Sequence, residues 1–132
     1  MSIKKGCILS ALILPALLTG CERPVSFESD VMPILQASCV SCHSGSGEGI
    51  QLTELNLTSY GQVMQGTKLG EIVVPGSAAS STLYLVIDHK VDTKIQMPPH
   101  HDDKFPQGEG KPLSTEQIAA IKRWIDEGAK NN

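Results

Sequence analysis

The chain has 132 residues, a formal net charge of −3 and few aromatic residues, which make up 4% of the total. This length allows one small domain. The 11 basic residues are outnumbered by 14 acidic ones, so a basic surface for nucleic acid is not expected. Because large side chains are scarce, a core of this size typically needs a covalent staple or a bound cofactor.

The first twenty residues have the pattern of a bacterial secretion signal. Lys4 and Lys5 precede an apolar run over residues 7–18. That run is too short to cross a bilayer as a helix but suits the hydrophobic region of a signal peptide. Residues 18–20, Leu-Thr-Gly, lead directly into Cys21 and resemble a bacterial lipobox. The resemblance implies cleavage before Cys21 and lipidation of its thiol, with a plain signal peptide as the alternative.

Cleavage after residue 20 would leave a chain with a net charge of −5, because it removes two lysines and no acidic residue. Residues 21–26 would then form a lipid-anchored tether, with residues 22–26 reaching about 17 Å when extended, and residues 27–132 would form the domain. An aspartate after the lipidated cysteine favours retention in the inner membrane of enteric bacteria. Since Glu22 occupies that place, a periplasm-facing lipoprotein of the outer membrane is favoured over the inner.

The mature domain is expected to begin with a helix over residues 27–40. Ser29 or Asp30 can cap this helix. Pro33 lies in the first turn, where its missing N–H matters least. Such a helix presents the motif CVSCH, residues 39–43, at its C-terminal end.

The middle of the chain carries weaker signals. In chain order we expect a loop over residues 44–56, a short helix over 58–65, an extended piece over 71–76 and a helix through 83–87 that Ser80 or Ser81 caps. Residues 88–112 are rich in proline and show no periodicity. A stretch of this length without regular structure is usually functional or disordered.

The last predicted helix has the clearest signals. Ser114 and Gln117 fit a capping box at its start, and Gly128 is placed to end it. An apolar stripe follows the helical period: Ile118, Ile121, Trp124 and Ile125. Trp124 is expected to pack this helix onto the N-terminal one or onto a cofactor.

The motif CVSCH admits four kinds of site. A thioredoxin-like dithiol needs a βαβ context and a helix N-terminus, whereas Cys39 and Cys42 follow the end of a helix. A disulfide between them would give His43 no role. A zinc site needs about four ligands, and the histidines available for one lack the usual spacing: His43, His89, His100 and His101.

Covalent haem, in contrast, uses every residue of the motif. The thiols of Cys39 and Cys42 can form thioethers with the two vinyl groups of haem, which places His43 as the proximal iron ligand. Attachment of c-type haem occurs outside the bacterial cytoplasm, in agreement with an exported chain. The macrocycle would also complete a core that is poor in aromatic residues, so we expect the chain without haem to be largely unfolded.

The second axial position decides the class of haem protein, because a side chain there favours electron transfer and an open position favours ligand binding. Met97 precedes Pro98 and Pro99, which stiffen the chain and prevent a helix. On residue chemistry alone Met97 is as readily a packed loop residue as a ligand. The other candidates are Met32, Met64, His89, His100 and His101.

Four segments together point to one family: FESDVMPILQASCVSCH at 27–43, GEIVVPGSAASSTLY at 70–84, IQMPPH at 95–100 and LSTEQIAAIKRWIDEGA at 113–129. They resemble the small single-haem cytochrome c domain of the planctomycete type, within the class I cytochrome c group. The resemblance implies an all-α fold with helices packed around one haem. It also implies that Met97 is the distal ligand, beside the thioethers at Cys39 and Cys42 and the proximal His43.

The stretch after Met97 is longer than the usual gap of the family, so His100 stays as the runner-up distal ligand. Proximal histidines normally donate their other ring N–H to a nearby acceptor, which we expect close to Pro75. These features predict a single-haem c-type cytochrome that is not an enzyme. It would transfer electrons between redox partner proteins at the periplasmic membrane surface.

Two alternatives need an open or labile sixth position on the iron. One is a haem-based sensor or small-ligand binder. The other is a peroxidase-like enzyme in which His100 or His101 serves as the acid–base group. If the electron-transfer interpretation is right, the acidic mature chain suggests a basic partner surface. Neither nucleic acid nor a small-molecule substrate is expected.

Overall fold

A computed structural model describes residues 22–99 and 110–132. Within these two ranges the regular elements are helices, and β character is limited to an isolated bridge between Thr67 and Gly70. The elements in chain order are η1 (Phe27–Val31), α1 (Met32–Ser38), α2 (Glu48–Thr53), α3 (Tyr60–Gln65), η2 (Ala78–Ser80), α4 (Thr82–Ile87), η3 (Thr93–Ile95) and α5 (Thr115–Asp126). The expected all-α, cytochrome c-like fold is therefore confirmed.

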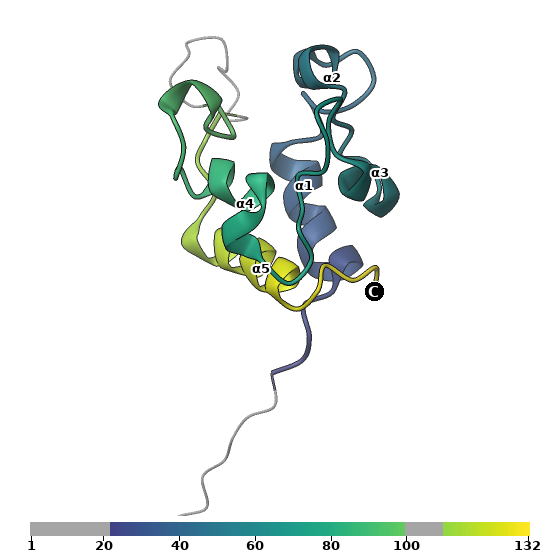
Figure 1. The fold of residues 1–132 in the computed structure, drawn as a ribbon, viewed down its shortest axis with the longest axis vertical. Coiled ribbons are helices and arrows are strands. Elements are labelled where there is room, and N and C mark those ends of the chain that lie inside the picture. The colour runs from purple at the N-terminus through teal and green to yellow at the C-terminus, as the bar shows by residue number, and fades with distance from the viewer. Residues whose placement is uncertain (1–21, 100–109) are drawn as a thin grey trace, which may run out of the picture.

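The helices form two groups. Figure 1 shows α1, α2 and α3 on one side, and α4 with the segment around η3 on the other, with α5 below α4. In the described residues no helix is both long and apolar enough to cross a membrane. The proposed signal peptide, Cys21, His100 and His101 lie outside the described residues.

The N-terminal helix begins as a π-helical turn, η1, and continues as α1. Its cap is Ser26, whose hydroxyl accepts the N–H of Ser29 at 3.2 Å. The expected cap, Ser29 or Asp30, is therefore wrong by one turn. The carboxylate of Asp30 instead accepts the N–H of Ser26 at 2.8 Å, so the side chains of Ser26 and Asp30 each accept a backbone N–H at the start of the helix.

The C-terminal helix α5 matches its sequence signals. Ser114 accepts the N–H of Gln117 at 3.3 Å, and the Gln117 side chain accepts the N–H of Ser114 at 2.8 Å, which completes the capping box. Gly128 follows the helix with φ of +102°. The N–H of Ala129 then reaches back to the carbonyl of Trp124 at 2.9 Å, as in a Schellman motif.

Three aromatic rings join the two ends of the chain. The ring centroids of Phe27 and Trp124 lie 5.2 Å apart, and Tyr60 packs edge-on against Phe27, also at 5.2 Å. Such pairs add stability beyond the area that they bury. Trp124 therefore packs α5 onto the N-terminal helix through η1, as expected.

Two parts of the middle region differ in detail from expectation. The expected loop at 44–56 contains the short helix α2, none of whose residues is buried, so its apolar residues Ile50 and Leu52 do not form a stripe that packs into the core. Ser81 precedes α4, as expected, but its hydroxyl does not cap the helix. It donates to the carbonyl of Ser77 at 2.8 Å and accepts the N–H of Val74 at 2.8 Å, because the preceding turn folds back over it.

Candidate functional site

The motif CVSCH continues the last turn of α1. The N–H of Cys39 donates to the carbonyl of Leu35 at 2.9 Å, and the N–H of His43 donates to the carbonyl of Cys39 at 2.9 Å. Residues four apart in such a turn share one side. Cys39 and His43 therefore face the same pocket, and Cys42 also lines it.

His43 is held by the chain segment that follows α2. Its side chain is buried, and its Nδ1 lies 3.4 Å from the carbonyl oxygen of Leu55. The backbone carbonyl of His43 in turn accepts the N–H of Leu57 at 2.9 Å. With Nδ1 as the donor to Leu55, the lone pair of Nε2 is left for a metal. The expected acceptor near Pro75 is therefore wrong.

Two glycines let α2 approach the motif closely. A Cβ at Gly49 would lie 2.7–2.9 Å from three atoms of the His43 ring, and one at Gly47 would lie 2.3 Å from the carbonyl oxygen of Cys42. That carbonyl also accepts the N–H of Ile50 at 3.0 Å. From the sequence, only a loop is expected in this region. The pair of glycines just after the motif is the signal that could have indicated a close backbone approach.

The motif opens into a pocket of about 680 Å³ between the two groups of helices. Its wall is mainly apolar and includes Leu55, Leu57, Ile72, Leu83, Val86 and Ile87. This volume lies within the range of about 300–1,000 Å³ that is usual for ligand and cofactor sites. Cys39, Cys42, His43 and Met97 all line it.

Met97 reaches the pocket from the segment after η3, which Figure 1 shows on the side opposite α1 and α2. It is half-buried, and its N–H donates to the carbonyl of Val86 at 3.1 Å. Pro98 and Pro99, which follow it, line the same pocket. The structure thus brings the predicted proximal and distal residues to one cavity.

The other described candidates for the distal position do not line this pocket. Met32 is buried in the core beside η1 and α1, and Met64 packs against the core from α3. His89 lies just beyond α4 and is likewise absent from the pocket wall. Among the candidates that the structure describes, Met97 is therefore the one that reaches the cavity.

Burial controls the protonation of the motif. It lowers the pKa of His43, against the weaker opposite effect of the Leu55 carbonyl. His43 is therefore neutral near pH 7, the state that metal coordination requires. Burial, and then the neighbouring Cys42, raise the pKa of Cys39 to about 12. A thiol that stays protonated is a poor redox nucleophile, which argues against a thioredoxin-like dithiol.

The donor set fits a covalently attached haem. Cys39 and Cys42 are free thiols beside a neutral imidazole, and a thioether lies across an apolar cavity. In the described ranges, no group of three or more His, Cys, Asp and Glu side chains forms a metal cluster. A helical fold with CxxCH at such a pocket defines the class of c-type cytochromes.

Comparison with protein families agrees. The model of the planctomycete cytochrome C family matches residues 39–101, from the first cysteine of the motif to just past Met97. This segment therefore belongs to the planctomycete-type cytochrome c domains, and the resemblance seen in the sequence is confirmed. The family carries covalent haem c, and cytochrome c domains are generally electron carriers. Comparisons with curated proteins and with solved structures found no match.

Proposed function

We propose that this protein is a single-haem electron carrier anchored by lipid on Cys21, with His43 and Met97 as the two axial ligands. One observation carries the proposal: His43 and Met97, from distant segments, line a single apolar pocket together with both cysteines of the motif. The haem supplies a reversible one-electron change at its iron when it is bound. The chain's own residues hold and insulate it.

His43 has the surroundings of a proximal ligand in the folded chain. Burial keeps its ring neutral, and the carbonyl of Leu55 accepts from Nδ1 so that Nε2 is free to coordinate. The backbone of Gly49 lies so close to the ring that a Cβ there would overlap it. A partner for the second ring nitrogen fixes ring orientation and strengthens a histidine ligand.

Met97 supplies a soft thioether on a stiff segment. Its N–H is bound to Val86, and Pro98 and Pro99 restrict the chain directly after it. A thioether stabilises ferrous over ferric iron, which raises the reduction potential. A methionine that stays bound in both oxidation states also keeps small ligands away from the iron.

The proposed location follows from the N-terminal sequence. The lipobox-like residues before Cys21 support a periplasm-facing membrane lipoprotein, with the outer membrane favoured over the inner. Removal of the signal leaves a net charge of −5. A redox partner with a basic surface would therefore associate faster at low ionic strength.

The experiment is a redox titration of the purified holoprotein, followed by exposure of its ferrous form to carbon monoxide at neutral pH. The proposal predicts one haem per chain, a single reversible one-electron transition and no rapid carbon monoxide binding. Rapid uptake by a high-spin form would contradict it and favour a sensor. Efficient peroxide turnover would instead favour a haem enzyme.

A further inference from the structure

The residues directly after Cys21 are bound to helix α5. The carbonyl of Arg23 accepts from the guanidinium of Arg123, which also pairs with Glu22 at 2.9 Å. The N–H of Val25 donates to the carboxylate of Glu127 at 2.7 Å. The segment expected to be a lipid-anchored tether is therefore attached to the domain from its first described residue.

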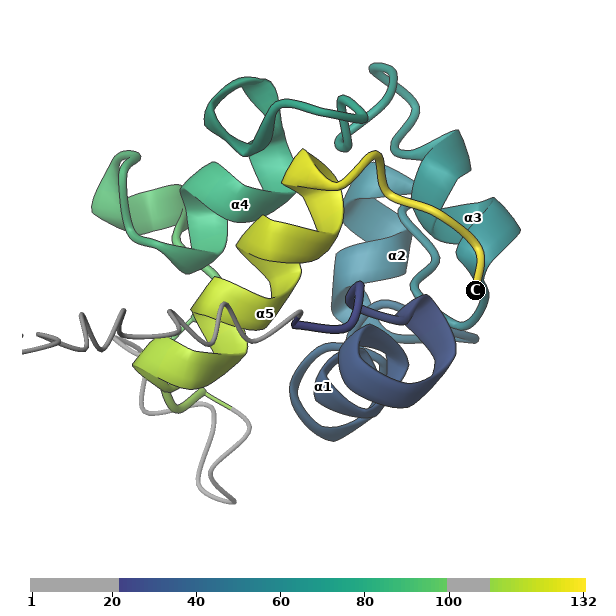
Figure 2. The same ribbon diagram turned by 90° about the horizontal axis from the view of Figure 1, so that it is seen from below.

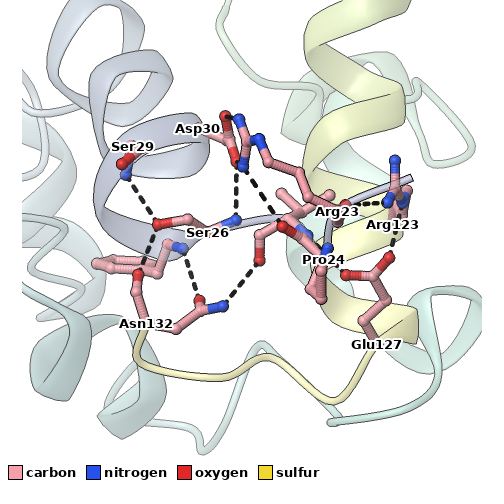
Figure 3. A network of polar contacts seen from close by, with 10 residues as sticks. Arg23, Pro24, Ser26, Ser29, Asp30, Arg123, Glu127 and Asn132 are labelled. Atoms are coloured by element: carbon pink, nitrogen blue, oxygen red, sulfur yellow. Dashed lines mark hydrogen bonds and ion pairs between the residues drawn. The ribbon is translucent and has the colours of Figure 1, made fainter. Parts of the chain in front are cut away.

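The C-terminal residue closes the same contact from the other side, as Figure 3 shows. The backbone oxygen of Asn132 accepts from the hydroxyl of Ser26 at 2.6 Å and from the N–H of Glu28 at 3.1 Å. Its side chain accepts the N–H of Phe27 at 3.0 Å and donates to the carbonyl of Val25 at 3.4 Å. Asn132 thus makes four hydrogen bonds to the chain that follows the anchor.

Arg23 makes this contact more rigid. Its two terminal guanidinium nitrogens donate to the two carboxylate oxygens of Asp30, both at 2.7 Å. Paired contacts of this kind restrict direction as well as distance. We call residues 22–28, with Asp30, Arg123, Glu127 and Asn132, the clasp.

The clasp lies at the end of the molecule opposite the mouth of the haem pocket. Exposed residues of the pocket wall mark the mouth, and they belong to α2, to the turn at 67–70 and to η3. The turn is held to the end of α2 by a 3.0 Å bond from the N–H of Lys68 to the carbonyl of Thr53. In Figure 1, α2 and the segment around η3 lie at the top, whereas residues 22–26 leave at the bottom.

The view from below agrees with this arrangement. Figure 2 shows the N-terminal segment and the C-terminal residues on the near side, with α2 partly behind them. Because residues 22–26 are bonded to the end of α5 and to Asn132, the roughly 17 Å of reach that these residues would have as an unattached tether is absent. Glu22, the residue that follows Cys21 in the sequence, therefore lies at this end of the domain.

We propose that the clasp fixes the orientation of the domain on the bilayer, with the clasp end against the lipid surface and the pocket mouth toward the aqueous phase. The inference rests on lipid anchoring at Cys21 as proposed above. It also specifies how a redox partner reaches the haem, because the partner then approaches from the aqueous side rather than from within the membrane plane.

Lysine acetylation can test this orientation on the full-length lipidated holoprotein in phosphatidylethanolamine–phosphatidylglycerol vesicles. Lys130 lies at the clasp beside Val25 and Asn132, and Lys68 lies at the mouth; both are exposed. Relative to the soluble chain that begins at Glu22, Lys130 should react severalfold more slowly on vesicles. Lys68 should keep its rate. Equal protection of both lysines, or protection of Lys68 alone, would overturn the proposal.

A clasp variant provides the second measurement. Deletion of Asn132 combined with Glu127→Ala should restore most of the reactivity of Lys130 on vesicles while the haem absorption spectrum stays unchanged. Gln51→Ala is the matched control, because it removes an exposed 2.7 Å hydrogen bond to Ser46 far from the clasp. If the clasp variant keeps the wild-type pattern, the clasp does not set the orientation.

Failure of the anchor is distinguishable from failure of the cytochrome. If mass spectrometry finds no lipid on Cys21 and the protein does not sediment with vesicles, the orientation proposal is overturned. The haem spectrum and the redox titration would then stand unaffected, since neither depends on the anchor.

Discussion

Gly49 shows how a single residue shapes the site, because its missing side chain leaves the space that the ring of His43 occupies. An alanine Cβ there would lie 2.7 Å from the ring, a distance that forces the ring or α2 to move. We expect Gly49→Ala to lower holoprotein stability by about 1–3 kcal/mol, as overpacking does, and to disturb the low-spin spectrum. Urea unfolding monitored by haem absorption would measure both effects.

Gly61→Ala is the control for this change. Gly61 lies in α3, and a Cβ there meets no atom within 4 Å. Alanine is favoured over glycine in a helix by about 0.8–1 kcal/mol, so this variant should be at least as stable as the wild type. Equal behaviour of the two variants would show that Gly49 has no role at His43.

The ion pair between Asp30 and Arg23 makes the stability of the clasp depend on pH. The guanidinium of Arg23, and then the N–H of Ser26, lower the pKa of Asp30 from 3.8 to about 2. A carboxylate with a depressed pKa in the folded state stabilises the protein above pH 4, and this contribution is lost as pH falls toward 2. Because Arg23 is largely exposed, solvent screening keeps this contribution small.

Asp30→Asn should therefore destabilise the holoprotein at pH 7 but not at pH 2. Unfolding by urea at both pH values measures the difference from the wild type. Glu28→Gln makes the same charge change at a neighbouring exposed position and serves as the control. A loss that is equal at both pH values would contradict the ion-pair explanation.

For single residues, the sequence predicted the chemical groups of the site better than the contacts that hold them. CVSCH and the proline pair after Met97 are local patterns, so the cysteines, the histidine and the methionine that line the pocket could be identified. The acceptor for His43 could not, because the carbonyl of Leu55 reaches the ring only through the path of the chain after α2. A backbone carbonyl also leaves no signature in residue type.

Among the elements, α5 depends most clearly on its own sequence. Ser114→Ala removes the cap from the N–H of Gln117, and N-cap losses of this kind cost about 0.5–2 kcal/mol. We expect a loss of about 1 kcal/mol in urea unfolding without a change in the haem spectrum. Ser114→Asp keeps an acceptor and should retain most of the stability. An alanine variant as stable as the wild type would contradict the capping role.

The helices differ in how far their own sequences predict them. The capping box, apolar stripe and terminal glycine of α5 all lie within the helix or next to it, and the structure confirms each. Helix α2 has no buried residue, and it is held by the bond from Ile50 to Cys42 and by glycine contacts. Its formation therefore depends on tertiary packing that a local pattern does not encode.

For the whole molecule, the pocket implies that folding depends on the cofactor. Apolar side chains line the 680 Å³ pocket, and they lack packing contacts wherever the pocket is not filled. Because a small domain is only marginally stable, such a loss of contacts can prevent folding. The chain made without haem should show little helical circular dichroism and no cooperative melting. A cooperatively folded apoprotein would contradict this expectation.

The proposed function depends most on Met97 as the second iron ligand. The ferric near-infrared charge-transfer band of an iron–methionine bond tests this assignment most directly. We predict this band in the wild-type holoprotein and in Met64→Leu, whose methionine packs against the core away from the pocket. Met97→Ala should lose the band. A wild type without the band would contradict the proposal: a high-spin spectrum would indicate an open site, and a low-spin spectrum would indicate another ligand, such as His100.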